Sequence, residues 1–386
     1  MKVSMIGLGK LGLPVAEVMS EQHDVKGYDT DPTIKNDKIQ ICNSLFNAVN
    51  DAEIIFIAVP TPHDPAYGGE APSSELPTKD FDYQYLKTTL THLVEYAPKD
   101  AMIVNISTVL PGTIRPIVTE LGISDQFIYN PYLIAMGTVT EDFLAPDIMM
   151  LGFNNWPTQE NKIKADKLVE FYKTVQTKRT PHTTLGTWEE AECIKIFHNT
   201  YISAKVGIAN MIQDVTNKIG HSNPTVIAES LRHADRIVSD KYMEPGMGDG
   251  GPCHPRDNIA LSWLAEKLDL GYDLFKSIMQ AREIQAENVA KELLSHNLPV
   301  HILGKSFKPE TNLTDGSTSM LVGHYVEQAG QTVTYDQYST EPAVYLLAHP
   351  VDYSDANFTA GSVVVDMYRK YNTFYDKIKV VHYGRT

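Results

Sequence analysis

The sequence predicts an α/β protein with a doubly wound domain at each end of the chain and a region of long helices between them. Short apolar runs typical of buried strands alternate with helical stretches in the first and last parts of the chain, which indicates parallel sheets. A glycine-rich turn follows the first apolar run, and a helical pattern without proline covers residues 187–219. We therefore expect an N-terminal Rossmann-type domain, a central long-helix region and a smaller Rossmann-like C-terminal domain.

In the N-terminal part, the first apolar run is followed by a helical pattern at Leu13–Glu21. Residues 61–80 are rich in proline and contain a Gly-Gly pair, which predicts a long surface loop. The strands expected there are Lys2–Ile6, Val25–Tyr28, Ile54–Val59 and Met102–Ile106.

The central helix is predicted to begin near Thr187, because Thr187-Trp188-Glu189-Glu190 has the spacing of a capping box. Further helices are expected over 255–296, and the alternation of strand and helix returns after Pro299. The last part should contain strands at 300–303, 332–336 and 363–366, with a loop over 304–318 and a helix ending near 329. The predicted domains are residues 1–186, 187–297 and 298–386.

The glycine-rich turn predicts a dinucleotide site. Its first glycine makes the turn, its second admits a pyrophosphate, and its third allows the next helix to pack closely. Asp29, at the end of the second strand, can accept hydrogen bonds from ribose hydroxyls and would repel a 2′-phosphate, so we expect NAD as the cofactor. The turn is Gly7-Leu8-Gly9-Lys10-Leu11-Gly12.

Composition excludes several other classes. A formal net charge of −15 argues against a general nucleic-acid surface. No apolar stretch approaches the length of a membrane span, and no apolar signal segment precedes the first strand, so we expect no membrane partner. Three cysteines without a Cys-x-x-Cys pair favour a reducing, cytoplasmic compartment, and the histidines lack metal-ligand spacing, so no metal is expected.

One cysteine has unusual neighbours. Cys253 follows the glycine-rich run 246–251 and Pro252, a pattern that predicts a loop wrapped around a substrate with one thiol presented to it. A small buried cysteine is the alternative, since most free cysteines are buried.

Five ordered motifs resemble the UDP-glucose/GDP-mannose dehydrogenase family, the nucleotide-sugar C6 dehydrogenases. The resemblance spans nearly the whole chain. The motifs are VPTP at 59–62, STVLPGT at 107–113, AECIKIFHN at 191–199, GDGGPCHPRD at 248–257 and SFKP at 306–309.

The resemblance implies a four-electron oxidation of a sugar 6-hydroxyl by NAD, through a thioester on Cys253, and a homodimer built on the central helix. It implies that Lys195 and Asn199, on one helix face, donate to the oxyanion at C6, and that Asp257 and Thr108 hold or activate a water. The implied cofactor residues are the glycine turn, Asp29, Val59, Pro60, Thr61, Thr108 and Arg256. The implied substrate residues are Tyr132, Lys195, Asn199, Gly248, Gly250 and Lys308.

The sequence departs from the family pattern around the substrate. Tyr132 stands where the family has a glutamate associated with acid/base work on the thioester, and a phenol is a poor base at neutral pH. Asp249 replaces an aromatic ring expected to line the sugar pocket. Residues 310–315 lack an arginine that the family uses to reach the substrate.

Three interpretations follow from this mixture. The chain is a working nucleotide-sugar dehydrogenase with altered preference, an NAD-dependent enzyme with an altered outcome such as incomplete oxidation, or a silent nucleotide-sugar-binding relative. The retained Cys253, Lys195, Asn199 and Asp257 favour the first two.

Overall fold

The computed structural model describes residues 1–62, 64, 76–77, 79–135, 137–238, 246–249, 251, 255, 258, 262, 265–309, 311–368, 370–371 and 377–383. The chain divides into two compact units, unit 1 (residues 1–205) and unit 2 (residues 206–386). The division into three domains stays a prediction.

Unit 1 is built on an eight-stranded sheet with the order β3-β2-β1-β4-β5-β6-β7-β8. The chain winds outward from β1 in both directions, so the order reverses between β1 and β4, and loops that follow neighbouring strands meet at this point. The strands are β1 (Lys2–Ile6), β2 (Asp24–Tyr28), β3 (Gln40–Ile41), β4 (Ile54–Ile57), β5 (Met102–Asn105), β6 (Phe127–Tyr129), β7 (Ile148–Phe153) and β8 (His182–Thr187).

The expected strands in unit 1 are present, with ends that differ by one or two residues from the prediction. The sheet is not wholly parallel, because β6 pairs with β7 in the antiparallel sense while β7 and β8 are parallel. An antiparallel neighbour needs no crossover helix spanning the sheet, and only a short helix lies between β6 and β7. β8 carries mixed side chains and gives no periodic signal, whereas β6 and β7 are apolar runs that the strand prediction did not include.

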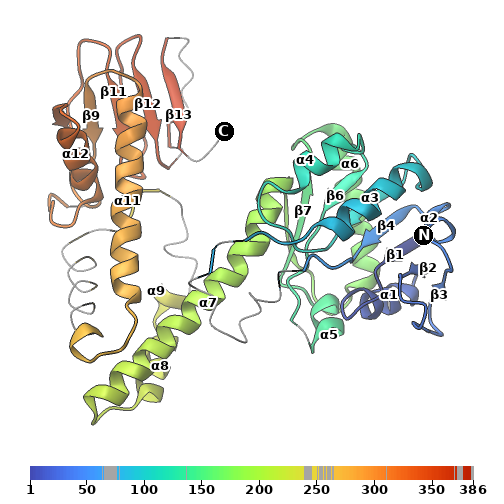
Figure 1. Ribbon diagram of the computed structural model, residues 1–386. Helices are drawn as coiled ribbons and strands as arrows, with labels where there is room; N and C mark the ends of the chain where they lie inside the picture. Colours follow the sequence, from blue (N-terminus) through green and yellow to red (C-terminus); the bar gives the residue numbers. More distant parts are fainter. Residues whose placement is uncertain are drawn as a thin grey trace. The chain divides into compact units, whose positions relative to one another are not determined.

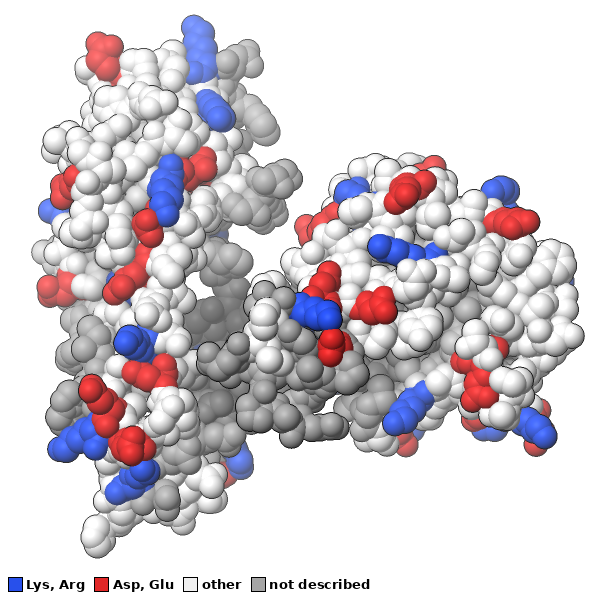
Figure 2. Space-filling model, in the orientation of Figure 1, with Lys and Arg blue, Asp and Glu red and all other residues white. Residues whose placement is uncertain are grey.

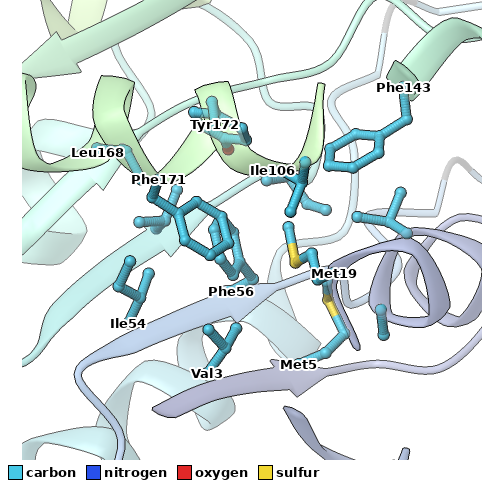
Figure 3. Packing of buried hydrophobic residues seen from close by; sticks show 14 of the residues in the cluster. Val3, Met5, Met19, Ile54, Phe56, Ile106, Phe143, Leu168, Phe171 and Tyr172 are labelled. Atoms are coloured by element: carbon cyan, nitrogen blue, oxygen red, sulfur yellow. The ribbon is translucent and has the colours of Figure 1, made fainter. Parts of the chain in front are cut away.

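Helices cover both faces of this sheet (Figure 1). One apolar cluster joins β1, β4 and β5 to α1, α5 and α6, with Phe56, Phe171 and Tyr172 packed in its centre (Figure 3). A second cluster joins the other face to α2, α3, α4 and Trp188. The helices are α1 (Gly12–Ser20), α2 (Leu45–Val49), α3 (Gln84–Tyr96), α4 (Ile114–Glu120), α5 (Val139–Leu144) and α6 (Gln159–Val175).

The long helix α7 (Trp188–Ile219) is present as predicted. Its capping box is confirmed, since the Glu190 N–H donates to Thr187 Oγ1 at 3.3 Å and the Thr187 N–H donates to the Glu190 carboxylate at 2.9 Å. The start of α7 is therefore fixed by its own sequence.

Unit 2 contains a five-stranded parallel sheet with the order β10-β9-β11-β12-β13. Helices α11 (Leu274–Ser295) and α12 (Thr318–Gln328) pack on one face through alanine, valine and leucine side chains. Aromatic residues including Tyr345, Phe358 and Tyr371 cover the other face. The strands are β9 (Val300–Leu303), β10 (Val333–Tyr335), β11 (Val344–Leu347), β12 (Val363–Asp366) and β13 (Lys379–His382), and two further helices are α8 (Pro224–Arg232) and α9 (Asp235–Val238).

The surface carries acidic and basic side chains interspersed over the face that Figure 2 shows. In the described part of the chain, no helix is both long enough and apolar enough to span a bilayer. The predicted surface loop at 61–80 falls mostly outside the described residues.

Candidate active site

The glycine turn after β1 is shaped by close backbone contacts. Gly7 has φ of +93°, and a Cβ there would lie 2.6 Å from the carbonyl oxygen of Ala58. A Cβ on Gly12 would lie 1.9 Å from the Gly7 carbonyl oxygen, so only glycine lets α1 begin against the turn. A Cβ on Gly9 would meet no atom within 4 Å, which leaves open space for a ligand at the start of α1.

Asp29 lies beside this turn at the end of β2. One carboxylate oxygen accepts the Leu8 N–H at 2.7 Å and the other accepts the Asp31 N–H at 2.9 Å. Each oxygen can accept a further hydrogen bond, so the carboxylate remains able to bind ribose hydroxyls. The glycine turn, the uncapped start of α1 and this carboxylate fit a dinucleotide.

The VPTP and STV motifs face each other across the ends of β4 and β5. The Thr61 hydroxyl donates to the Thr108 carbonyl oxygen at 2.6 Å, and the Ser107 hydroxyl donates to the Val59 carbonyl oxygen at 2.7 Å. The two loops are far apart in the sequence, and these two hydrogen bonds hold them together. The Thr61 and Ser107 hydroxyls therefore have a structural role in joining the two loops.

A cleft of about 1180 Å³ opens at this edge of the sheet, within unit 1. Its lining joins the glycine turn to the loops after β4, β5 and β6 and to α7. Of the predicted site residues, those that line it are Gly7, Gly9, Lys10, Leu11, Asp29, Val59, Pro60, Thr61, Thr108, Tyr132 and Lys195.

Lys195 is 8% exposed at the end of this cleft, although its side chain is charged in water. Its ammonium donates to the Tyr132 carbonyl oxygen at 2.5 Å. Burial lowers the pKa of Lys195, which eases loss of its proton to a reacting group. Asn199 lies one turn further along α7, exposed, with Oδ1 3.3 Å from His198 Nδ1.

The Tyr132 phenol is held in the core of unit 1. Its hydroxyl lies 2.8 Å from the Tyr172 hydroxyl, which donates to Asn130 Oδ1, and the Asn130 amide donates to the Met150 carbonyl oxygen at 2.8 Å. Because Asn130 uses its amide nitrogen on Met150, Tyr172 must donate to its oxygen, and Tyr132 must in turn donate to Tyr172. The Tyr132 ring also packs 5.5 Å from the Phe143 ring.

The Tyr132 hydroxyl is therefore committed as a donor to a buried partner. Burial raises its pKa above the ordinary value, which makes ionisation still harder. Tyr132 lines the cleft beside Lys195, and its backbone carbonyl accepts the hydrogen bond from the Lys195 ammonium.

Sequence reasoning overlooked Glu192, which is fully buried on α7. Its carboxylate accepts the Gly112 N–H at 2.6 Å and the Ile114 N–H at 2.8 Å, where the STVLPGT loop enters α4. The sequence held one sign of this role. Glu192 lies four residues after Trp188, so an apolar helix face that begins at the tryptophan includes an acid.

In unit 2, the glycine run packs directly on neighbouring side chains. A Cβ on Gly246 would lie 2.0 Å from the Tyr368 ring, whose hydroxyl accepts the Met247 N–H at 3.1 Å. Gly251 has φ of +88°, and a Cβ there would lie 3.0 Å from the Phe307 ring. These glycines are therefore required by packing.

Asp249 has a partner that its sequence neighbourhood does not reveal. Arg282 of α11 donates to the Asp249 carboxylate at 2.8 Å and to the Gly316 carbonyl oxygen at 2.8 Å. The Thr318 hydroxyl donates to the Asp249 backbone carbonyl at 2.8 Å. The acid that stands in place of the expected ring thus ties the glycine run to α11, and its backbone carbonyl ties the run to α12.

Gly248 and Lys308 line one pocket of about 270 Å³ in unit 2. The pocket lies at the start of α12, where Ser317, Thr318 and Ser319 supply hydroxyl groups. Helix N-termini and hydroxyls suit an anion. The predicted site residues Gly250, Cys253, Arg256 and Asp257 lie outside the described residues. Among the described residues, no three histidine, cysteine or acidic side chains gather as a metal site.

Comparisons with known proteins agree with this geometry. The pattern of the UDP-glucose/GDP-mannose dehydrogenase family, NAD binding domain, matches residues 32–176, and that of the family's central domain matches residues 189–284. Together the two matches cover more than half of the 386 residues.

The chain is 27% identical to the UDP-glucose 6-dehydrogenase of Rickettsia conorii over 330 residues, which cover 83% of this chain and 70% of that protein. It is 26% identical to the GDP-mannose 6-dehydrogenase of Pseudomonas aeruginosa over 355 residues, covering 81% of this chain and 75% of that protein.

A crystal structure of a ternary complex of GDP-mannose dehydrogenase from Pseudomonas aeruginosa has a TM-score of 0.80 to this chain. The two share 22% sequence identity, and the match covers 98% of this chain and 99% of that one, so the likeness supports the fold. With the two family matches and the glycine turn beside Asp29, these findings lead to one conclusion: the chain belongs to the UDP-glucose/GDP-mannose dehydrogenase family and is an NAD-dependent oxidoreductase.

Proposed function

We propose that this protein oxidises the 6-hydroxyl of a nucleotide sugar to a carboxylate, with NAD as the oxidant. The observation that carries the proposal is that Gly9, Asp29, Thr108 and Lys195 line one cleft in unit 1. A cofactor placed along the glycine turn and Asp29 would extend toward Thr108 and Lys195, the residues implicated in chemistry at C6.

In this proposal, the glycine turn and Asp29 would hold NAD, which would supply a hydride acceptor, and two NAD molecules would be used in succession for each carboxylate formed. Lys195 donates a hydrogen bond to the oxygen at C6, and its lowered pKa lets it exchange the hydroxyl proton. Asn199, on the same helix one turn on, supplies a second donor. Thr108 holds the attacking water.

Cys253 is proposed to carry the intermediate. Its thiolate adds to the aldehyde formed by the first oxidation, the second oxidation converts the adduct to a thioester, and water displaces the thiol to release the carboxylate. Four electrons leave the substrate and one water oxygen enters it. The proposed role of Asp257 is to accept a proton from that water.

The pocket at the start of α12 is proposed to hold the diphosphate of the nucleotide sugar. Lys308 supplies a positive charge there, and Ser319 at the start of α12 supplies a hydroxyl group, whereas the Ser317 and Thr318 hydroxyls already donate to the carbonyl oxygens of Lys305 and Asp249.

Cys253→Ser tests the chemical proposal. With a panel of nucleotide sugars that includes UDP-glucose and GDP-mannose, the parent should form two NADH for each substrate consumed. The serine variant should bind NAD normally and lose carboxylate formation by ~10²-fold or more, since a serine ester forms and hydrolyses less readily. Cys193→Ser, a half-buried cysteine on α7, is the matched control and should behave as the parent. A serine variant with parental turnover would remove Cys253 from the mechanism.

The hydrogen bonds of Tyr132 favour a second outcome, in which the reaction stops or slows at the thioester. If release of the acid needs a carboxylate at position 132, the phenol cannot replace it, because it donates to Tyr172 and its pKa is raised. Oxidation would then proceed to the thioester and stop or slow there.

Intact-protein mass spectrometry during turnover distinguishes the two outcomes. For the second, we expect an adduct on Cys253, faster release by ~10²- to 10⁴-fold in Tyr132→Glu, and unchanged release in Tyr132→Phe, which removes only the hydroxyl. For the complete reaction, no adduct should accumulate and Tyr132→Glu should lower activity. Glu141, exposed at the start of α5, is then the next candidate base to remove.

Asp29 should set the preference for NAD over NADP. Asp29→Asn keeps an acceptor for the Leu8 N–H but removes the charge that a 2′-phosphate would meet, so the preference should fall at least ~10-fold, chiefly through tighter NADP binding. Asp31→Asn, an exposed acid two residues on, is the control. Equal effects of the two substitutions in calorimetry would contradict the role of Asp29.

We also propose a homodimer formed through α7. Large apolar side chains are exposed on this helix, among them Phe197 at 63%, Ile202 at 49% and Ile208 at 47%. Ile212 is half-buried, and the Val206 side chain lies outside the description.

Light scattering should give twice the 43.1 kDa chain mass at micromolar concentration. Ile202→Glu combined with Ile208→Glu should give the monomer mass, because charges at a buried interface lose hydration. Ile163 on α6 is 60% exposed, and Ile163→Glu should leave the mass unchanged. A monomeric parent would refute this assembly.

A further inference from the structure

Two charged residues occupy core-facing positions on α7. Trp188, Ala191, Glu192 and Lys195 follow the i, i+3, i+4, i+7 spacing of one helix face, and their exposed fractions are 0%, 3%, 0% and 8%. Such a face is normally apolar, because an ionised side chain loses hydration when it is buried. The chain tolerates this cost at two positions one turn apart.

Each of these two charged side chains forms hydrogen bonds with the backbone of a different loop. The Glu192 carboxylate accepts the N–H groups of Gly112 and Ile114, at 2.6 and 2.8 Å. Lys195 donates to the Tyr132 carbonyl oxygen at 2.5 Å. The helix therefore ties the loop after β5 and the loop after β6 to adjacent turns of one rigid element.

The loop after β5 carries Thr108, which lines the cleft with Lys195. Other hydrogen bonds also hold this loop: the Thr61 hydroxyl donates to the Thr108 carbonyl and the Ser107 hydroxyl to the Val59 carbonyl. The Tyr129 hydroxyl accepts the Val109 N–H at 3.3 Å, and the Tyr83 hydroxyl accepts the Leu110 N–H at 3.2 Å. Glu192 is the link that relates this loop to the helix of Lys195.

A purely structural role for the carboxylate would be the attachment of α4 to α7, but another pair already does this. Arg115 of α4 donates to the Glu189 carboxylate, with one bond of 2.8 Å, and its guanidinium lies 5.0 Å from the centre of the Trp188 ring. Burial raises the pKa of Glu192, and the N–H groups of Ile114 and Gly112 offset part of this by stabilising the carboxylate.

We propose that Glu192 is a positioning residue for the oxidation, which fixes Thr108 against Lys195 by holding the backbone of the loop after β5. The role in turnover rests on the proposed function, whereas the restraint of the loop does not. Misplacing a catalytic group by about 1 Å can cost on the order of 10²-fold in rate, so the effect should appear in kcat.

The test compares Glu192→Gln with Glu189→Gln in the full-length protein. Glutamine offers only one acceptor oxygen to two N–H groups, so with saturating NAD the amides of Gly112 and Ile114 should exchange with deuterium ~10-fold faster. With a nucleotide sugar that the parent oxidises, kcat should fall ~10- to 100-fold while the KM for NAD changes less than ~3-fold. Glu189→Gln, which loses a charge on the same turn of α7, should leave both the amide exchange and kcat at parental values.

Several results would overturn the proposal. Parental exchange at Gly112 and Ile114 in Glu192→Gln would remove the restraint, whether or not any nucleotide sugar is oxidised. Faster amide exchange in Glu192→Gln with a parental kcat would show that Glu192 only stabilises the loop. An equal fall of kcat in Glu189→Gln would show the same. If Glu192→Gln does not fold, Glu192→Asp keeps the charge on a shorter side chain and should show the same split between kcat and KM.

Discussion

The cofactor end of the cleft depends on the contact between the start of α1 and the turn after β1. A single Cβ on Gly12 would overlap the Gly7 carbonyl oxygen, and one on Gly7 would meet the backbone of Ala58. Absence of side chains at these positions brings the helix N-terminus to the edge of the sheet beside Asp29. This close packing leaves space for a dinucleotide beside Asp29. The proposed roles of residues further along the cleft depend on a cofactor bound in that space.

The other end of the cleft is organised by α7. This helix begins at its own capping box and then places Glu192 and Lys195 against loops that arrive from β5 and β6. Both side chains bond to backbone groups of the loops. The contacts between α7 and the loops therefore do not depend on which side chains the loops carry at these positions. Tyr132 illustrates the result, since its carbonyl serves Lys195 while its phenol belongs to the core.

The departures from the family pattern acquire two different physical meanings. Asp249 is matched by Arg282, so this substitution is compensated within unit 2 and holds the glycine run in place. Tyr132 is compensated as a packing residue through Tyr172 and Asn130, but its hydroxyl is not available as a base. The Asp249 substitution is thus accommodated by the packing of unit 2, whereas the Tyr132 substitution leaves no base at position 132 for the proposed release of the acid.

The sequence alone determined the features that depend on local chemistry. The glycine spacing, the acid at the end of β2, the capping box of α7 and the apolar strands each follow from residues near one another in the chain. Short strands with mixed side chains, and the antiparallel pairing of β6 with β7, gave no periodic signal that could reveal them.

Only the tertiary structure decided what the buried polar groups contact. The partners of Glu192 lie 78 and 80 residues away, that of the Tyr132 hydroxyl lies 40 residues away, and Asp249 and Arg282 are separated by 33. A polar side chain in the core must find a hydrogen-bond partner, but its identity depends on which backbone segments the fold brings alongside. For that reason the sequence predicted Lys195 and Tyr132 as site residues, while the fold determined that both line one cleft and that the Lys195 ammonium donates to the Tyr132 carbonyl oxygen.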